Sequence, residues 1–392
     1  MKNTFFLAMI IMLYSAQIKA QNWNVGSGGN SSRNCLSAVA NGPTEADILW
    51  QKEAISAMQQ QTVIDGEIVV TCPVININDV LHGTLIVARD LYTGDILWTK
   101  DLPVDFPETD WRNRVSGFKN GVIYATRSGS TNSSYLYALD EEYGSILWKS
   151  ADLIDEYGTE SCSFTDDGNL IVGNLFNIIC INATNGETIW QTPRPDAAPT
   201  SGGQEVSVYG NRGYFWIADF NGPKICVINI ETGEILYSSE SVSGGLVQQI
   251  CPFIGSDGTV YVPRAQSNIA TDFIVAYEDN GIALIEKWRV PIGWFPFSTS
   301  GEGPDGSIYT YSSQGELIRL NPADGSILNI SPPFLFDEIH SPRLAIDNSG
   351  QIFVTNGGLN GTIYSFNPDL TLSWAYNVGI LNHSGPALAD NG

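Results

Sequence analysis

One short pattern recurs along this chain at a spacing of about 40–50 residues. It consists of an aliphatic run, an acidic residue, a turn that contains glycine, two or three aliphatic residues and an aromatic. The clearest copies are Leu85–Trp98, Tyr135–Trp148 and Ile178–Trp190, and weaker copies follow as far as Ile363–Trp374. A fixed period of this size indicates a fold built from one repeated unit.

Each unit predicts a four-stranded antiparallel sheet. Alternating side chains on both sides of the glycine turn are typical of two strands joined as a hairpin. A second series of eight glycines, from Gly66 (VIDGEIVV) to Gly392 (LADNG), marks another hairpin out of phase with the first. Two hairpins per period match the size of a propeller blade, so we expect an all-β fold that forms a single β-propeller.

The recurring tryptophans end the last strand of most units. Burying an indole at this place removes roughly 150–250 Å² of surface from water. A single blade exposes two apolar faces, which its neighbours must cover. We therefore expect these tryptophans to pack between adjacent blades: Trp50, Trp98, Trp148, Trp190, Trp288 and Trp374.

The motif A-x-D-x-x-x-G-x-x-x-W around Trp98 and Trp148 resembles the PQQ-like repeat of the quinoprotein alcohol dehydrogenase-like β-propellers. The segment Trp23–Trp50 is also similar to the lead-in segment that is common in that family. The resemblance covers nearly all of the chain after its first twenty residues. It implies a propeller fold, whereas the functions of the family are divided among dehydrogenases, assembly scaffolds and uncharacterised secreted proteins.

Eight copies of the second glycine series predict eight blades, with a seven-bladed ring as the alternative. The last copy, in His383–Gly392, stops before its second strand. We expect this strand to share a blade with Asn34–Ala40 and Asp47–Gln51, so that the two ends of the chain close the ring and cover open sheet edges. Either the eighth blade has three strands or the sequence is truncated after Gly392.

The first twenty residues are typical of a signal peptide. Lys2 supplies the positive charge, Phe5–Tyr14 the apolar stretch, and Ile18–Ala20 a cleavage site before Gln21. We expect the mature chain, residues 21–392, to form one propeller domain and to be exported as a soluble periplasmic or extracellular protein. No cysteine follows the cleavage site and no other apolar run approaches twenty residues, so we expect neither a lipid anchor nor a membrane span.

The chain has 42 acidic and 19 basic side chains, and its net charge is −23. This charge repels nucleic acids and anionic membranes and suits cations. The six cysteines lack the spacing of a zinc or haem site. Two alternatives remain for them: a disulfide, with Cys162–Cys180 as the first candidate, or burial as small apolar side chains.

Ligands of propellers usually bind at a mouth of the central channel, near the residues where the innermost strands begin. Two of the three histidines, His340 and His383, fall at nearly matching places in adjacent units, and each precedes a serine. A neutral imidazole pair is suited to a metal, a sugar hydroxyl or proton transfer, and the alternative is that both histidines cap strand ends. The candidate channel-mouth residues are Arg112, Arg114, Glu160, Glu205, Gln248, Gln249, Trp294, His340, Arg343 and His383.

For a quinone-dependent dehydrogenase, the family resemblance implies PQQ, a calcium ion, a catalytic aspartate and commonly a vicinal disulfide. This chain has no Cys-Cys pair and no GxSxG, GxxxxGK or HExxH motif. The acidic turns at Asp166–Asp167 and Glu278–Asp279 lack the alternating oxygens of a calcium loop, so we assign no catalytic residue, cofactor or metal.

The favoured hypothesis is therefore a monomeric, non-catalytic propeller that binds a protein or a glycan at one face. Two alternatives stay open. One is a PQQ- and calcium-dependent oxidoreductase of reduced size, and the other is an outer-membrane assembly scaffold.

Overall fold

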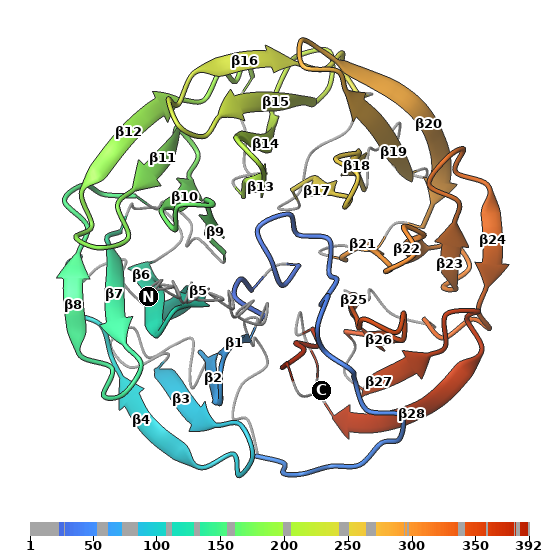
Figure 1. Cartoon of the computed structure of the whole chain (residues 1–392), viewed down its shortest axis with the longest axis horizontal. Coiled ribbons are helices and arrows are strands. Elements are labelled where there is room, and N and C mark those ends of the chain that lie inside the picture. The colour runs from blue at the N-terminus through green and yellow to red at the C-terminus, as the bar shows by residue number, and fades with distance from the viewer. Residues whose placement is uncertain are drawn as a thin grey trace, which may run out of the picture.

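The computed structural model describes residues 23–26, 28–52, 62–72, 85–106, 112–128, 134–154, 161–198, 205–242, 251–263, 272–293, 295, 298–335, 342–357, 360–379, 381 and 385–390. These residues form seven four-stranded antiparallel sheets, arranged as blades around a central axis (Figure 1). In every blade the strands follow one another in chain order from the axis to the rim (Figure 1). The predicted all-β propeller is confirmed.

The strands have the following bounds. Blade one consists of β1 (Val63–Asp65), β2 (Ile68–Thr71), β3 (Ile86–Asp90) and β4 (Ile96–Lys100). Blade two consists of β5 (Arg112–Lys119), β6 (Val122–Ser128), β7 (Leu136–Asp140) and β8 (Ile146–Lys149). Blade three consists of β9 (Ser163–Phe164), β10 (Leu170–Gly173), β11 (Asn177–Ile181) and β12 (Thr188–Pro193). Blade four consists of β13 (Ser207–Tyr209), β14 (Arg212–Ile217), β15 (Lys224–Asn229) and β16 (Ile235–Ser238).

The remaining three blades repeat the same order. Blade five consists of β17 (Phe253–Ile254), β18 (Val260–Val262), β19 (Asp272–Asp279) and β20 (Leu284–Ile292). Blade six consists of β21 (Gly301–Glu302), β22 (Ile308–Tyr311), β23 (Leu317–Leu320) and β24 (Ile327–Ile330). Blade seven consists of β25 (Arg343–Ile346), β26 (Ile352–Thr355), β27 (Gly361–Phe366) and β28 (Leu372–Gly379).

The short turns of all blades lie on one face of the disc, which we call the turn face. They join the first strand to the second and the third to the fourth, and antiparallel pairing places both turns at the same end of the sheet. The turn after β7 is held by the Asp140 carboxylate, which accepts hydrogen bonds from the backbone N–H groups of Tyr143 and Ser145 at 2.7 Å each. We call the opposite face, where the first and third strands of each blade begin, the loop face.

The recurring indoles join neighbouring blades at their turns. The Nε1–H group of Trp98 in blade one donates to the carbonyl of Glu141 in blade two, at 2.7 Å. The same bond recurs from Trp148 to Ala183, from Trp190 to Ile230 and from Trp288 to Pro322, at 2.9–3.0 Å. Each indole thus satisfies its one polar group on the blade that follows it.

The glycine of the next turn lets the indole approach. Gly144 has a φ of +65°, and a Cβ atom there would lie 2.7 Å from Cε3 of Trp98. Apolar clusters continue the contact inward, where Val70 and Ala88 of blade one pack with Ile123 of blade two. The contact between blades one and two therefore extends from their turns into the apolar interior.

The prediction of eight blades is wrong, because the described residues form seven. Among these residues neither end of the chain forms a strand. The segment expected as an outer strand, Asn34–Ala40, lies at the axis instead, where Leu36 forms a single parallel bridge with Ile346 of β25. A segment with so few backbone hydrogen bonds to any one sheet is not a blade strand. The number of repeats in the sequence therefore exceeds the number of sheets.

Both ends of the chain nevertheless contact blades one and seven. Trp374 of blade seven donates to the carbonyl of Pro43 at 3.1 Å, and Trp50 donates to the carbonyl of Leu91 in blade one at 2.8 Å. Near the other end, Leu388 is buried in one apolar cluster with residues of both blades. The described contacts are thus of the kind that joins neighbouring blades, without strand pairing between the two ends.

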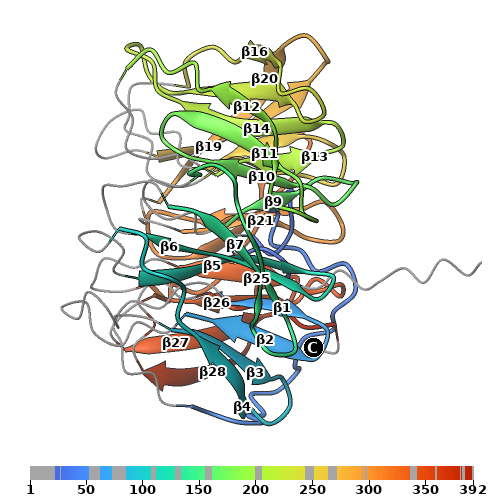
Figure 2. The same cartoon turned by 90° about the vertical axis from the view of Figure 1, so that its left-hand side faces the viewer.

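Residues 23–26 and 28–40, which we call the axial segment, run through the centre of the ring (Figure 1). Figure 2 shows this blue segment from the side, on the same face of the disc as the C-terminal end. All seven innermost strands donate one backbone N–H group to it, at 2.7–2.9 Å. The donors are Ile64, Phe118, Phe164, Val208, Ile254, Glu302 and Ile346.

The predicted disulfide between Cys162 and Cys180 is absent, and the alternative of buried thiols is confirmed. All six cysteines are buried and unpaired. The Cys162 thiol donates to the carbonyl of Ser116 in blade two at 3.4 Å, whereas Cys180 is paired across the sheet with Trp190. Among the described residues, no helix is long and apolar enough to cross a membrane.

Candidate functional site

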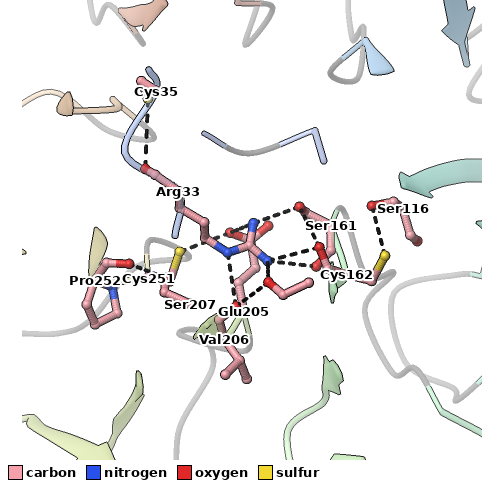
Figure 3. A network of polar contacts seen from close by, with 11 residues as sticks. Arg33, Cys35, Ser116, Ser161, Cys162, Glu205, Val206, Ser207, Cys251 and Pro252 are labelled. Carbon is pink, nitrogen blue, oxygen red and sulfur yellow. Dashed lines mark hydrogen bonds and ion pairs between the residues drawn. The ribbon is translucent and has the colours of Figure 1, made fainter. Parts of the chain in front are cut away.

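The centre of the ring holds a polar network around Arg33 of the axial segment (Figure 3). The backbone at Arg33 has a φ of +57°, a conformation that a non-glycine residue adopts rarely and that needs support from its surroundings. That support comes from blades three and four. The guanidinium donates to the carbonyl of Val206 at 3.1 Å and to the hydroxyls of Ser161 at 2.7 Å and Ser163 at 3.1 Å.

Glu205 compensates the charge of Arg33. Its Oε2 atom lies 3.6 Å from Nη1 of Arg33, whose side chain is 2 % exposed. The thiol of Cys251 lies 3.5 Å from the same carboxylate, where it is placed to donate (Figure 3). A buried guanidinium with a carboxylate and several oxygen acceptors is a satisfied ion pair, so this network fills the axis with the chain's own groups.

The thiols around the axis are protonated at neutral pH. Burial raises the pKa of Cys35, Cys162 and Cys251 to about 12 each, although neighbouring arginines act in the opposite direction. A thiol with so high a pKa carries little thiolate, which is the nucleophilic form. These cysteines are therefore suited to packing and hydrogen bonding and not to nucleophilic chemistry.

Three of the ten candidate channel-mouth residues have described side chains. Arg114 of β5 and Arg343 of β25 are buried, and Glu205 pairs with Arg33. Arg112 begins β5, and only its backbone is described. Six candidates lie outside the described residues: Glu160, Gln248, Gln249, Trp294, His340 and His383. The histidine pair therefore stays a prediction.

Arg33 is the central residue that the sequence analysis missed. The segment Trp23–Trp50 resembles the lead-in segment of the repeat family, and part of it was expected to form outer strands of an eighth blade. One signal could have indicated the axis: the stretch Val25–Asn30 (VGSGGN) has no strand alternation and is rich in residues that adopt a positive φ. Gly28 and Gly29 do adopt φ values of +78° and +77°.

The described residues do not fit a calcium-bound PQQ. No group of three His, Cys, Asp or Glu side chains within the described part of the chain could hold a metal ion. The acidic turns are engaged elsewhere. Asp279 accepts hydrogen bonds from two tyrosines and pairs with Arg212 at 2.9 Å, and Asp167 accepts a hydrogen bond from Asn169.

Comparisons with known proteins support the repeat family. Residues 132–274 match the family model described as outer membrane protein assembly factor BamB, a family of PQQ-like repeats. No curated protein matches the chain. Among solved structures, the C-terminal WD40 domain of Sif2 aligns with a TM-score of 0.56 at 11 % identity, over 83 % of this chain and 88 % of that one. This likeness shows the propeller fold alone.

Two further structures align with lower scores. BamB from Moraxella catarrhalis aligns with a TM-score of 0.48 at 15 % identity, over 78 % of this chain and 81 % of that one. The quinohemoprotein alcohol dehydrogenase ADHIIG from Pseudomonas putida HK5 aligns with a TM-score of 0.43 at 12 % identity, over 93 % of this chain and 73 % of that one.

Proposed function

We propose a non-catalytic binding role for this chain, which matches a family model of PQQ-like repeats over residues 132–274. Its ligand is a protein or a carbohydrate, and it binds on the loop face, at the mouth of the axis where the innermost strands begin. The observation that carries this proposal is the occupied axis. Arg33 and its partners fill the place where a propeller could hold a cofactor, which leaves the outer surface of the face for a ligand.

An assembly scaffold of the outer membrane is the second candidate. The specific observation in its favour is the description of the matching family model, an outer membrane protein assembly factor. A scaffold needs a stable surface and no reactive group, and the protonated thiols around the axis agree with that. An oxidoreductase dependent on PQQ and calcium is disfavoured, because the described residues do not supply its donor set.

Export and ring closure complete the proposal. We propose that residues 1–20 are a signal peptide and that residues 21–392 fold as one exported propeller. The two ends of this domain close the ring together in the sector between blades seven and one. The hydrogen bonds of Trp374 to Pro43 and of Trp50 to Leu91 support this closure, since they repeat the bond that joins successive blades.

Two assays distinguish the three functions. In the first, the full chain is incubated with PQQ, Ca²⁺, a redox dye and a panel of alcohols and sugars. We expect no dye reduction above background, and turnover would overturn the non-catalytic proposal. In the second, the chain is screened against a glycan array and cross-linked to envelope proteins. Capture of the envelope β-barrel assembly machinery would favour the scaffold over the general binding role.

The position of the ligand is tested with the two candidate channel-mouth histidines. We expect the double variant His340→Ala, His383→Ala to bind the ligand found in the screen at least tenfold more weakly than the native protein. His82→Ala is the control, because it removes the third histidine of the sequence without changing a candidate residue. Unchanged affinity in the double variant would show that the assignment of the channel-mouth residues is wrong.

A further inference from the structure

A cavity of about 390 Å³ opens on the turn face between blades three and four. One wall is apolar and consists of Trp190, Cys180 and Ile230. The rim carries polar side chains from the turn between β9 and β10 and from two turns of blade four. This volume lies within the usual range of small-ligand sites, about 300–1,000 Å³.

Two other junctions of the ring have a bridging side chain at the position that Thr165 occupies at this junction. At the end of β5, the Lys119 ammonium lies 4.8 Å from the centre of the Phe164 ring in blade three. At the end of β13, the Tyr209 hydroxyl donates to the carbonyl of Ser256 in blade five at 3.0 Å. Lys119 and Tyr209 each come directly after the residue whose backbone N–H donates to the axial segment. The residue at the same position in blade three is Thr165.

Thr165 is too short to reach blade four. Its hydroxyl bonds within its own turn, to the Asp167 carboxylate and the Asn169 carbonyl. Cys180 is also small, and it is paired across the sheet with Trp190. At the equivalent position, blade six has the long side chain of Arg319, which is paired with Asn329. Neither Thr165 nor Cys180 fills the space between blades three and four, and both line the cavity.

The electrostatic character of the cavity is negative. Asp166, Asp167 and Glu231 line it, and none of the described residues that line it is basic. The hydrogen bond from Thr165 is the largest of the effects that lower the pKa of Asp167 below its ordinary value, so this carboxyl is ionised at neutral pH. Lys119 interacts electrostatically with Asp166 and compensates part of the charge. The net charge of the chain, −23, adds a field of the same sign.

We propose that this cavity binds an organic cation, an ammonium or guanidinium group on an apolar stem. The stem lies against the wall of Trp190 and Ile230, where burial of methylene groups and the aromatic ring favour it. The charged end lies at the rim among the three carboxylates. The amide side chains of Asn169 and Asn211 provide further oxygen acceptors for its N–H groups.

Agmatine is the direct probe, since it carries a guanidinium and an ammonium on a four-carbon stem. We expect saturable binding to the full chain by titration calorimetry, weakened at least fivefold between 20 mM and 200 mM salt. Glu231→Gln should weaken it at least fivefold. Glu234→Gln is the matched control, because it removes the same charge from the same turn, at a residue that does not line the cavity.

A filling variant tests the place of binding. Thr165→Tyr introduces the side chain that blade four has at this position, and we expect it to abolish agmatine binding. Its thermal unfolding is measured in parallel. If Thr165→Tyr does not fold, Glu231→Gln against Glu234→Gln still decides the question.

Two sources of the cation are then compared. Tighter binding of acetyl-Gly-Arg-Gly-amide than of agmatine would assign the cavity to an arginine side chain of a protein partner, and the reverse would assign it to a free amine. Three results would overturn the proposal: no saturable binding of either probe, equal binding by Glu231→Gln and Glu234→Gln, or binding of neutral sugars without binding of agmatine. The cavity lies on the opposite face from the proposed ligand of the loop face, so the two sites fail or succeed independently.

Discussion

At the residue scale, one junction of the ring replaces the indole with a different chemistry. Tyr237 stands where most units have tryptophan, and its hydroxyl donates to the Asp279 carboxylate of blade five at 2.5 Å. Tyr214 donates to the same carboxylate at 2.7 Å, and Arg212 pairs with it at 2.9 Å. A charge-assisted bond to a partly buried carboxylate thus takes over the role of the bond from indole to carbonyl.

Removing this hydroxyl should destabilise the protein. We expect Tyr237→Phe to lower the free energy of unfolding by about 1–2 kcal/mol, because the bond involves a charged acceptor. Tyr209→Phe is the control at the same junction, since the exposed Tyr209 hydroxyl donates to a neutral carbonyl. In denaturant unfolding, Tyr209→Phe should lower the free energy of unfolding by less than Tyr237→Phe does. An equal decrease for the two variants would contradict the role of the carboxylate.

The same carboxylate makes stability depend on pH. Burial acts to raise the pKa of Asp279, but hydrogen bonds from Tyr237, Gly281 and Tyr214 outweigh it and lower the pKa below its ordinary value. The stabilisation is therefore fully present above the unfolded pKa of about 3.9 and is lost as the pH falls through the lower folded value. We expect the stability difference between the native protein and Asp279→Asn to narrow below about pH 4. A difference that grows in acid would contradict this direction.

Ser31 provides a test within a single residue. Its hydroxyl accepts the N–H of Phe164 at 2.8 Å, whereas its carbonyl accepts the N–H of Val208 at 2.7 Å. Ser31→Ala removes only the first acceptor. We expect amide hydrogen exchange to accelerate about tenfold at Phe164, as loss of one bond implies, and to stay unchanged at Val208. Equal acceleration at both amides would show that the axial segment had been displaced as a whole.

At the element scale, the sequence predicted the blades well because their signals are local. Alternation of side chains marks the strands, and glycines such as Gly144 and Gly168 mark turns with a positive φ. The number of sheets was not predicted correctly, because it was counted from eight copies of the second glycine series. The described residues of the last copy, 385–390, form no strand, and neither does the described stretch around Trp50. The motif encodes the bond between an indole and the neighbouring turn, and Trp50 makes that bond without a sheet of its own.

Two turn glycines separate backbone strain from packing. Gly144 and Gly168 both have a positive φ, but only Gly144 lies against an indole, and nothing lies within 4 Å of a Cβ atom at Gly168. Gly168→Ala should cost about 1 kcal/mol for backbone strain alone. Gly144→Ala should cost about 1–3 kcal/mol more, because it also displaces Trp98. Equal costs in chemical denaturation would argue against indole packing as the joint between blades.

At the scale of the whole molecule, the axial segment connects what the blades alone leave separate. Each blade contacts mainly its two neighbours, as in other repeat proteins, whereas the axial segment contacts all seven innermost strands. This could not be predicted from the sequence, since the bonds join residues such as Cys35 and Ile346 far apart in the chain and follow no local period. The network around Arg33 could not be predicted for the same reason. Its partners Ser161, Val206 and Glu205 lie far from Arg33 in the sequence and come close to it only in the closed ring.

Residue-resolved hydrogen exchange of the seven amides that face the axis tests the central claim most directly. They are the N–H groups of Ile64, Phe118, Phe164, Val208, Ile254, Glu302 and Ile346. If the axial segment holds the ring, all seven are strongly protected in the native protein, and Arg33→Ala accelerates exchange at all of them while the amides between β3 and β4 keep their protection. Rapid exchange of these seven amides in the native protein would contradict an axis filled by the chain itself.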